Sequence, residues 1–76
     1  MNFNLITYKN KTPQIRSSVF IADGVKVIGD VTIDENSSIW FNSVIRADVN
    51  FIKIGKKTNI QDLSLIHISE PTRQSL

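Results

Sequence analysis

A repeat of six residues is clearest in residues 20–45, which read FIADGVKVIGDVTIDENSSIWFNSVI. An aliphatic residue recurs there every six positions, and the series resumes after a slip of three residues. Its members are Ile21, Val27, Ile33, Ile39, Ile45, Ile54, Ile60 and Ile66. Six is neither the helical period of 3.6 residues nor the strand period of two. The period is typical of a solenoid in which each hexapeptide forms a short strand and a turn.

A small or β-branched residue stands four positions after each aliphatic residue, for example Val25, Ser37 and Thr58. We expect the aliphatic side chain to point into the core and the small residue to let the backbone turn a corner. A single coil cannot bury its own apolar edge, so each coil would stack on the next. The sequence therefore predicts an all-β fold.

The slip lies between Ile45 and Ile54, where Val49, Asn50 and Phe51 are additional to the six-residue spacing. In a solenoid such an insertion bulges outward at a corner and leaves the core undisturbed. Bulged loops often carry function. A functional loop and a tolerated insertion both remain open as interpretations.

Four large apolar residues fall outside the inward series: Phe20, Trp40, Phe41 and Phe51. Exposed apolar patches tend to mark interfaces. We therefore expect a face that packs against another subunit, with purely internal packing as the alternative.

Residues 1–17 read as an N-terminal strand, Phe3–Tyr8, a turn at Lys9–Thr12 and a lead-in to the repeats. The repeats themselves occupy residues 18–62. With 76 residues, the chain has room for one small domain.

Composition excludes several classes of function. The chain has no cysteine, so it has neither a disulfide framework nor a thiolate metal site. Its net charge of +2 is too small to favour nucleic acid or an anionic membrane as a partner. The N-terminus lacks the pattern of a signal peptide, and no apolar run has the length of a membrane span. The expected location is the cytoplasm.

Residues 18–31, 37–48 and 54–62 resemble the γ-class carbonic anhydrase family, and the resemblance covers about residues 13–62. The hexapeptides alone fit many acyltransferases, whereas Arg46-x-Asp48 and Asn59-Ile-Gln61-Asp62 are similar to the carbonic anhydrase branch. The resemblance implies a left-handed parallel β-helix, truncated here to about three coils. It also implies assembly as a homotrimer.

The activity implied by the resemblance is reversible hydration of carbon dioxide to bicarbonate, a lyase reaction. Family members use hydroxide bound to zinc or iron, held by three histidines between subunits. The resemblance assigns the orienting of that hydroxide to Gln61 and the charged pair near the site to Arg46 and Asp48. By register, His67 takes the place of the first metal ligand. As alternatives, Arg46 and Asp48 form an ordinary surface pair, and Gln61 is a plain polar residue.

The chain also departs from the family pattern. It has one histidine in total, so the other two ligands are absent, and Val49 stands where active members carry an acidic residue. We therefore expect a fragment of a longer metalloprotein, itself inactive and without metal. Whether this chain is an enzyme stays open.

The last segment, residues 63–76, reads as a non-native tail. Codons for residues 63–73 can spell the transposon-end adapter used in short-read sequencing libraries, so His67 would match the family by coincidence. The alternative is a genuine final strand that ends at Pro71.

Two other functions share the predicted fold, because fold does not decide function. One is a hexapeptide-class acyltransferase that uses acyl-CoA and a downstream histidine as general base. The other is a non-catalytic trimeric scaffold.

Overall fold

The computed structural model describes residues 2–67 of the chain and contains eight strands over that range. Their bounds are β1 (Asn4–Ile6), β2 (Gln14–Ile15), β3 (Phe20–Ile21), β4 (Lys26–Ile33), β5 (Ser38–Ile39), β6 (Val44–Ile54), β7 (Asn59–Ile60) and β8 (Leu65–His67). All of these strands pair in parallel. Among the described residues, no helix is long and apolar enough to cross a membrane.

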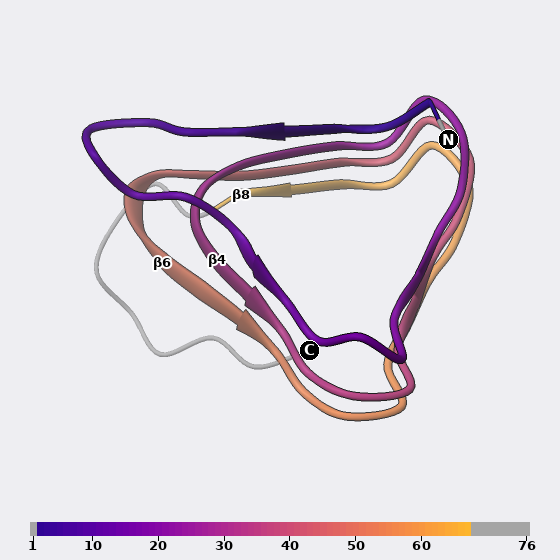
Figure 1. The fold of residues 1–76 in the computed structure, drawn as a ribbon. Helices are drawn as coiled ribbons and strands as arrows, with labels where there is room; N and C mark the ends of the chain where they lie inside the picture. The colour runs from indigo at the N-terminus through magenta and orange to yellow at the C-terminus, as the bar shows by residue number, and fades with distance from the viewer. Residues whose placement is uncertain (1, 68–76) are drawn as a thin grey trace.

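The strands wind into coils of triangular cross-section (Figure 1). The first side of the triangle carries β1, the start of β4, the start of β6, and β8. The second side carries β2 and the ends of β4 and β6, and the third side carries β3, β5 and β7. From the N-terminus in Figure 1, the coils turn counterclockwise as they recede, which is a left-handed path. The predicted fold class, a left-handed parallel β-helix of hexapeptide repeats, is confirmed.

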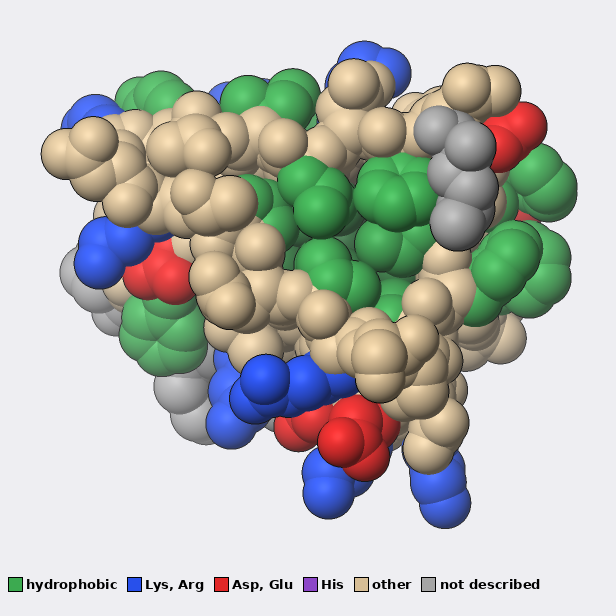
Figure 2. All heavy atoms as spheres, viewed as in Figure 1, with side chains coloured by type: hydrophobic (Ala, Val, Ile, Leu, Met, Phe, Trp, Pro, Cys, Tyr) green, Lys and Arg blue, Asp and Glu red, His purple; other side chains and the backbone are tan. Residues whose placement is uncertain are grey.

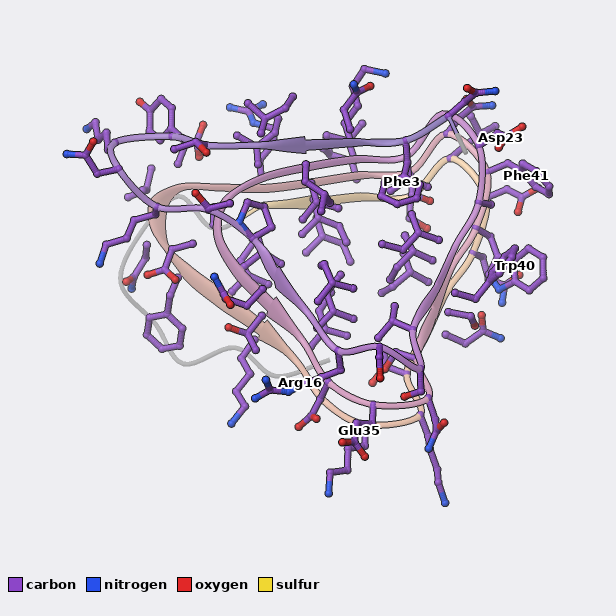
Figure 3. All side chains as sticks on the ribbon, in the orientation of Figure 1. Phe3, Arg16, Asp23, Glu35, Trp40 and Phe41 are labelled. Atoms are coloured by element: carbon purple, nitrogen blue, oxygen red, sulfur yellow. The ribbon has the colours of Figure 1, made fainter. Side chains whose placement is uncertain are left out.

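The six-residue series forms the core. Seven of its members have exposed fractions of 6% or less: Ile21, Val27, Ile33, Ile39, Ile45, Ile54 and Ile60. The eighth, Ile66, packs half-buried against them. Viewed along the axis, apolar side chains fill the triangle and charged ones surround it (Figure 2), and Phe3 packs against the core from within (Figure 3). Each fully buried aliphatic side chain contributes about 1.5–3 kcal/mol to the stability of the fold. The six-residue spacing in the sequence is therefore the spacing of the positions that stabilise the core.

Two of the small residues at the corners also form hydrogen bonds between coils. Ser37 is buried, donates a hydrogen bond from its hydroxyl to the Gly55 carbonyl at 2.8 Å, and accepts one from the Thr58 amide at 3.1 Å. Ser43 donates in the same way to the Gln61 carbonyl at 2.7 Å. A buried hydroxyl thus satisfies backbone groups in the turn of the next coil, which would otherwise be costly to bury.

The predicted insertion bulges outward as expected. Lys26 pairs with Val44, 18 positions later, whereas Val31 pairs with Ile52, 21 positions later. The three additional residues therefore fall at the corner between the first and second sides. Val49 and Phe51 in this insertion are 60% and 48% exposed, so the core below is undisturbed.

The first coil has an insertion at the same corner. β1 pairs with β4 at a spacing of 22 residues, and β2 pairs with β4 at a spacing of 18. The four additional residues fall in a tight hairpin, in which the Tyr8 and Lys11 backbones exchange hydrogen bonds of 2.9 and 3.0 Å. Lys9 and Asn10 at its tip have φ of 50° and 66°, so the predicted turn is confirmed. The observed strand, Asn4–Ile6, is shorter than the predicted Phe3–Tyr8.

Candidate functional site

The predicted charged pair forms within one chain. Arg46 and Asp48 lie two residues apart on β6, so both side chains leave the same face of the strand. An Arg46 Nη2 donor lies 2.6 Å from Asp48 Oδ2, and the two side chains are 44% and 24% exposed. An ion pair this exposed contributes about 0–1 kcal/mol to stability. Its contribution to stability therefore does not by itself explain why the pair is present.

The backbone register brings His67 beside Arg46. On the first side, Arg46 is flanked by Ile28 in the coil above and by His67 in β8. The three positions form one column across three coils. The side chain of His67 lies outside the described part of the structure, so its role as a metal ligand stays a prediction. The same holds for the boundary after Asp62, although β8 pairs with β6 in the regular register.

Gln61 lies at the opposite end of the first side from Asp48. It follows β7 at the corner between the third and first sides, and its carbonyl accepts the Ser43 hydroxyl. The side chains of Gln61 and Asp62 are exposed. Within one chain, the structure therefore pairs Arg46 with Asp48 and leaves Gln61 at a separate corner.

Asn59 is held by residues that the sequence did not single out for this purpose. Its Oδ1 accepts a hydrogen bond from Ser38 Oγ at 3.0 Å, and that oxygen accepts one from Trp40 Nε1 at 3.1 Å. Ser38 and Asn59 are register partners in β5 and β7. The only sequence signal would have been their spacing of 21 residues, which equals one coil with the insertion.

The described residues do not fit a three-ligand metal centre. Over residues 2–67, no group of three or more histidine, cysteine, aspartate or glutamate side chains is placed to hold an ion. A site of three histidines would need ligands that this chain does not contain, because it has one histidine.

A pocket of about 250 Å³ opens at the corner between the first and second sides. The hairpin residues Tyr8 and Lys11 form one wall, Asp30 lies on the coil between, and Asp48 and Phe51 form the other wall. The two insertions therefore enclose a hollow next to the Arg46–Asp48 pair. The sequence identified the second insertion as a candidate functional loop but gave no account of the first.

The off-lattice aromatic residues lie on the outside, as predicted. Phe20 and Phe41 are 48% and 45% exposed, and Trp40 is half-buried between them. Its ring centroid lies 4.9 Å from that of Phe20 and 6.1 Å from that of Phe41. Figure 3 shows Trp40 and Phe41 pointing away from the core. Phe51, also exposed, lies on the separate insertion.

Known proteins are similar to this chain in sequence and in fold. Residues 12–47 match the family model described as bacterial transferase hexapeptide (six repeats). A carbonic anhydrase of Geobacillus kaustophilus is 60% identical over 62 residues, which cover 82% of this chain and 34% of the relative. YtoA of Bacillus subtilis, an uncharacterized transferase, is 53% identical over 82% of this chain and 36% of its own length.

The mitochondrial γ carbonic anhydrase 2 of Arabidopsis thaliana is 46% identical over 87% of this chain and 24% of its own length. A solved structure of a Bacillus cereus protein named as an acetyltransferase superposes with a TM-score of 0.79 at 43% identity. That match covers 88% of this chain and 45% of the other. The chain thus spans about a third of the length of the first two relatives. Together with the coil geometry, these similarities make the chain a hexapeptide-repeat protein related to the γ-class carbonic anhydrases.

Proposed function

We propose that this chain is part of a γ-type carbonic anhydrase, a protein that reversibly hydrates carbon dioxide to bicarbonate. The observation that carries the proposal is the Arg46–Asp48 pair. It lies at 2.6 Å on the outside of a coil, where it contributes little to stability. The sequence similarity to carbonic anhydrases supports the same function.

In this proposal, each motif residue has a separate task. Gln61 orients the attacking oxygen, and Arg46 and Asp48 organise the edge of the site. Zinc or iron would be held mainly by residues that this chain lacks, with His67 as one ligand only if the tail is genuine. The described residues bring no three ligands together. We therefore expect the 76-residue chain alone to be inactive.

In a homotrimer, the Gln61 end of the first side in one copy would meet the Asp48 end of the first side in the next copy. Gln61 and Asp48 lie at opposite ends of that side in one chain, so a site using both would need two copies. The exposed rings of Phe20 and Phe41 offer an apolar surface for such a contact. The expected partners are therefore two further copies and a small-molecule substrate.

The test begins with the source DNA downstream of the codon for Asp62. We expect further hexapeptides and two more histidines, and we expect the longer protein to hydrate carbon dioxide in a stopped-flow assay. In that protein, Gln61→Ala should lower the rate about 100-fold, the effect of removing one hydrogen-bonding side chain from the reacting oxygen, whereas Thr32→Ala on the second side should not. Hydration by the purified 76-residue chain, or a longer protein without further histidines, would contradict the proposal.

An acyltransferase function is the second candidate. It is favoured by the hexapeptide transferase model over residues 12–47 and by the acetyltransferase-named structure from Bacillus cereus. Calorimetric titration of the longer protein with acetyl-CoA separates the two candidates. Saturable binding with acyl transfer and no hydration of carbon dioxide would favour the transferase.

A further inference from the structure

Three side chains form a chain of hydrogen bonds on the outside of the third side. Trp40 Nε1 donates to Ser38 Oγ at 3.1 Å, and Ser38 Oγ donates to Asn59 Oδ1 at 3.0 Å. Ser38 and Asn59 lie one above the other in consecutive coils. The Trp40 backbone amide also donates to the Ile60 carbonyl at 2.8 Å. The two coils are therefore linked at Asn59 and at the residue that follows it.

The direction of these bonds follows from the chemistry of the indole. An indole N–H can only donate, so Ser38 Oγ must accept from it. The Ser38 hydroxyl still has its own proton to donate, and Asn59 Oδ1 accepts it at 3.0 Å. Only the Oδ1 end of the Asn59 amide accepts, so the NH₂ end is turned away from Ser38. Asn59 is exposed, so its N–H donors, which are turned away from Ser38, belong to a side chain that solvent can reach.

The aromatic neighbours hold the indole in place. The Phe20 ring lies 4.9 Å from that of Trp40 at an interplanar angle of 49°, and the Phe41 ring lies 6.1 Å away on the sequence-adjacent residue. Tilted aromatic pairs at these distances attract one another. Phe20 is in turn the register partner of Ser38. The indole thus packs against Phe20, which lies in the same column as Ser38 and Asn59.

We infer that Trp40 and Ser38 are positioning residues that fix Asn59 as an outward-facing N–H donor for an oxyanion. Under the proposed function, on which this inference rests, the oxyanion is bicarbonate. Asn59 stands two residues before Gln61, so the donor lies beside the residue expected to orient the attacking oxygen. Neither Trp40 nor Ser38 needs to touch the substrate. Their effect is to select one of the two orientations of the Asn59 amide.

The first test uses nuclear magnetic resonance on the ¹⁵N-labelled 76-residue chain. Ser38→Ala should speed solvent exchange of the Trp40 indole proton about 3- to 10-fold, the range for loss of one net hydrogen bond. Trp40→Phe should shift the Asn59 side-chain NH₂ resonances while the β7 backbone resonances stay in place. Thr32→Ala, an outward hydroxyl on the second side, is the matched control and should do neither. Unchanged indole exchange in Ser38→Ala overturns the inference, and that variant keeps every aromatic ring if Trp40→Phe does not fold.

The second test separates the orienting of Asn59 from the proposed function. Titration of the longer protein described under the proposed function with sodium bicarbonate should move the Asn59 NH₂ resonances, and Ser38→Ala should reduce that response at least threefold. Thr32→Ala should respond like the parent chain. If the indole responds to Ser38→Ala but bicarbonate leaves Asn59 unmoved, the bicarbonate assignment and the support it gives to the proposed function are overturned. The orienting role then stands without them.

Discussion

The two corners that flank the second side stack their coils in different ways. The regular corner consists of residues 16–19, 34–37 and 55–58, and its coils keep a constant register through the turn. The variable corner consists of residues 7–13, 29–30 and 48–51, and its coils differ in length by three or four residues. The comparison shows where this fold requires a fixed sequence and where it tolerates change.

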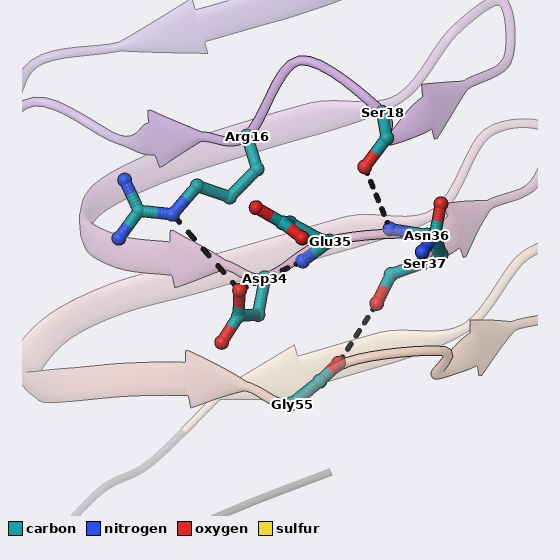
Figure 4. A network of polar contacts seen from close by, with 7 residues as sticks. All are labelled: Arg16, Ser18, Asp34, Glu35, Asn36, Ser37 and Gly55. Carbon is teal, nitrogen blue, oxygen red and sulfur yellow. Dashed lines mark hydrogen bonds and ion pairs between the residues drawn. The ribbon is translucent and has the colours of Figure 1, made fainter.

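Each turn of the regular corner is bonded to the next. Ser18 Oγ accepts the Asn36 amide at 2.9 Å, Ser37 Oγ donates to the Gly55 carbonyl, and Arg16 lies 3.9 Å from Asp34 (Figure 4). An insertion here would separate all of these partners. At the variable corner, the loops project into solvent and enclose the pocket beside Asp48, so additional residues change the surface and leave the core intact.

The largest expected effect is at Gly29, where β4 passes the variable corner. Gly29 is buried with φ of +85°, and a Cβ there would lie 2.6 Å from the Ala47 carbonyl oxygen. Gly29→Ala should therefore lower the free energy of unfolding by about 2–4 kcal/mol, measured by urea denaturation. Gly24→Ala is the matched control. Its φ is +81°, but the added Cβ would meet the movable Asn42 side chain, so its cost should be smaller. Equal losses would mean that backbone overlap is not the cause.

The next largest effect is expected from a substitution that removes hydrogen bonds at the regular corner. Ser37→Ala removes a buried hydroxyl and leaves the Gly55 carbonyl and the Thr58 amide without this partner. The expected loss is about 1–3 kcal/mol in the free energy of unfolding. Ser17→Ala, an exposed neighbour in the coil above, should change it by less than about 0.5 kcal/mol. If both variants unfold at the same urea concentration, the hydroxyl does not hold the coils together.

A smaller effect is expected from shortening the variable corner. Deletion of residues 49–51 restores a spacing of 18 residues between the coils and removes a wall of the pocket. Because these residues are largely exposed and loop length has a weak effect on stability, the change should be within about 1 kcal/mol. Insertion of Gly-Ser-Gly after Asn36 at the regular corner is the matched comparison and should cost more. A deletion variant that fails to fold would show that the insertion supports the core.

Sequence alone predicted the regular features, because they depend only on spacing along the chain. The isoleucine and valine series identified the core, and its slip identified the insertion at Val49. The four additional residues before Gln14 escaped notice, since the first coil has no earlier coil against which to count them. The links from Trp40 to Asn59 depend on which residues stack in neighbouring coils. That register becomes known only when the insertion at residues 49–51 is placed at its corner.

The smallest effects on stability are expected at two ion pairs of the described residues, one at each corner. Asp34→Asn weakens the Arg16 pair at 3.9 Å, and Asp48→Asn weakens the Arg46 pair at 2.6 Å. Both pairs are partly exposed, so each change should cost less than about 1 kcal/mol, and 1 M salt should reduce the difference from the parent chain. Enzyme activity should distinguish the two variants. In the longer hydratase proposed above, Asp48→Asn should lower carbon dioxide hydration at least tenfold, while Asp34→Asn leaves it unchanged. Equal activity in both variants would count against a role for the Arg46–Asp48 pair, because a pair that affects neither folding nor turnover is an ordinary surface contact.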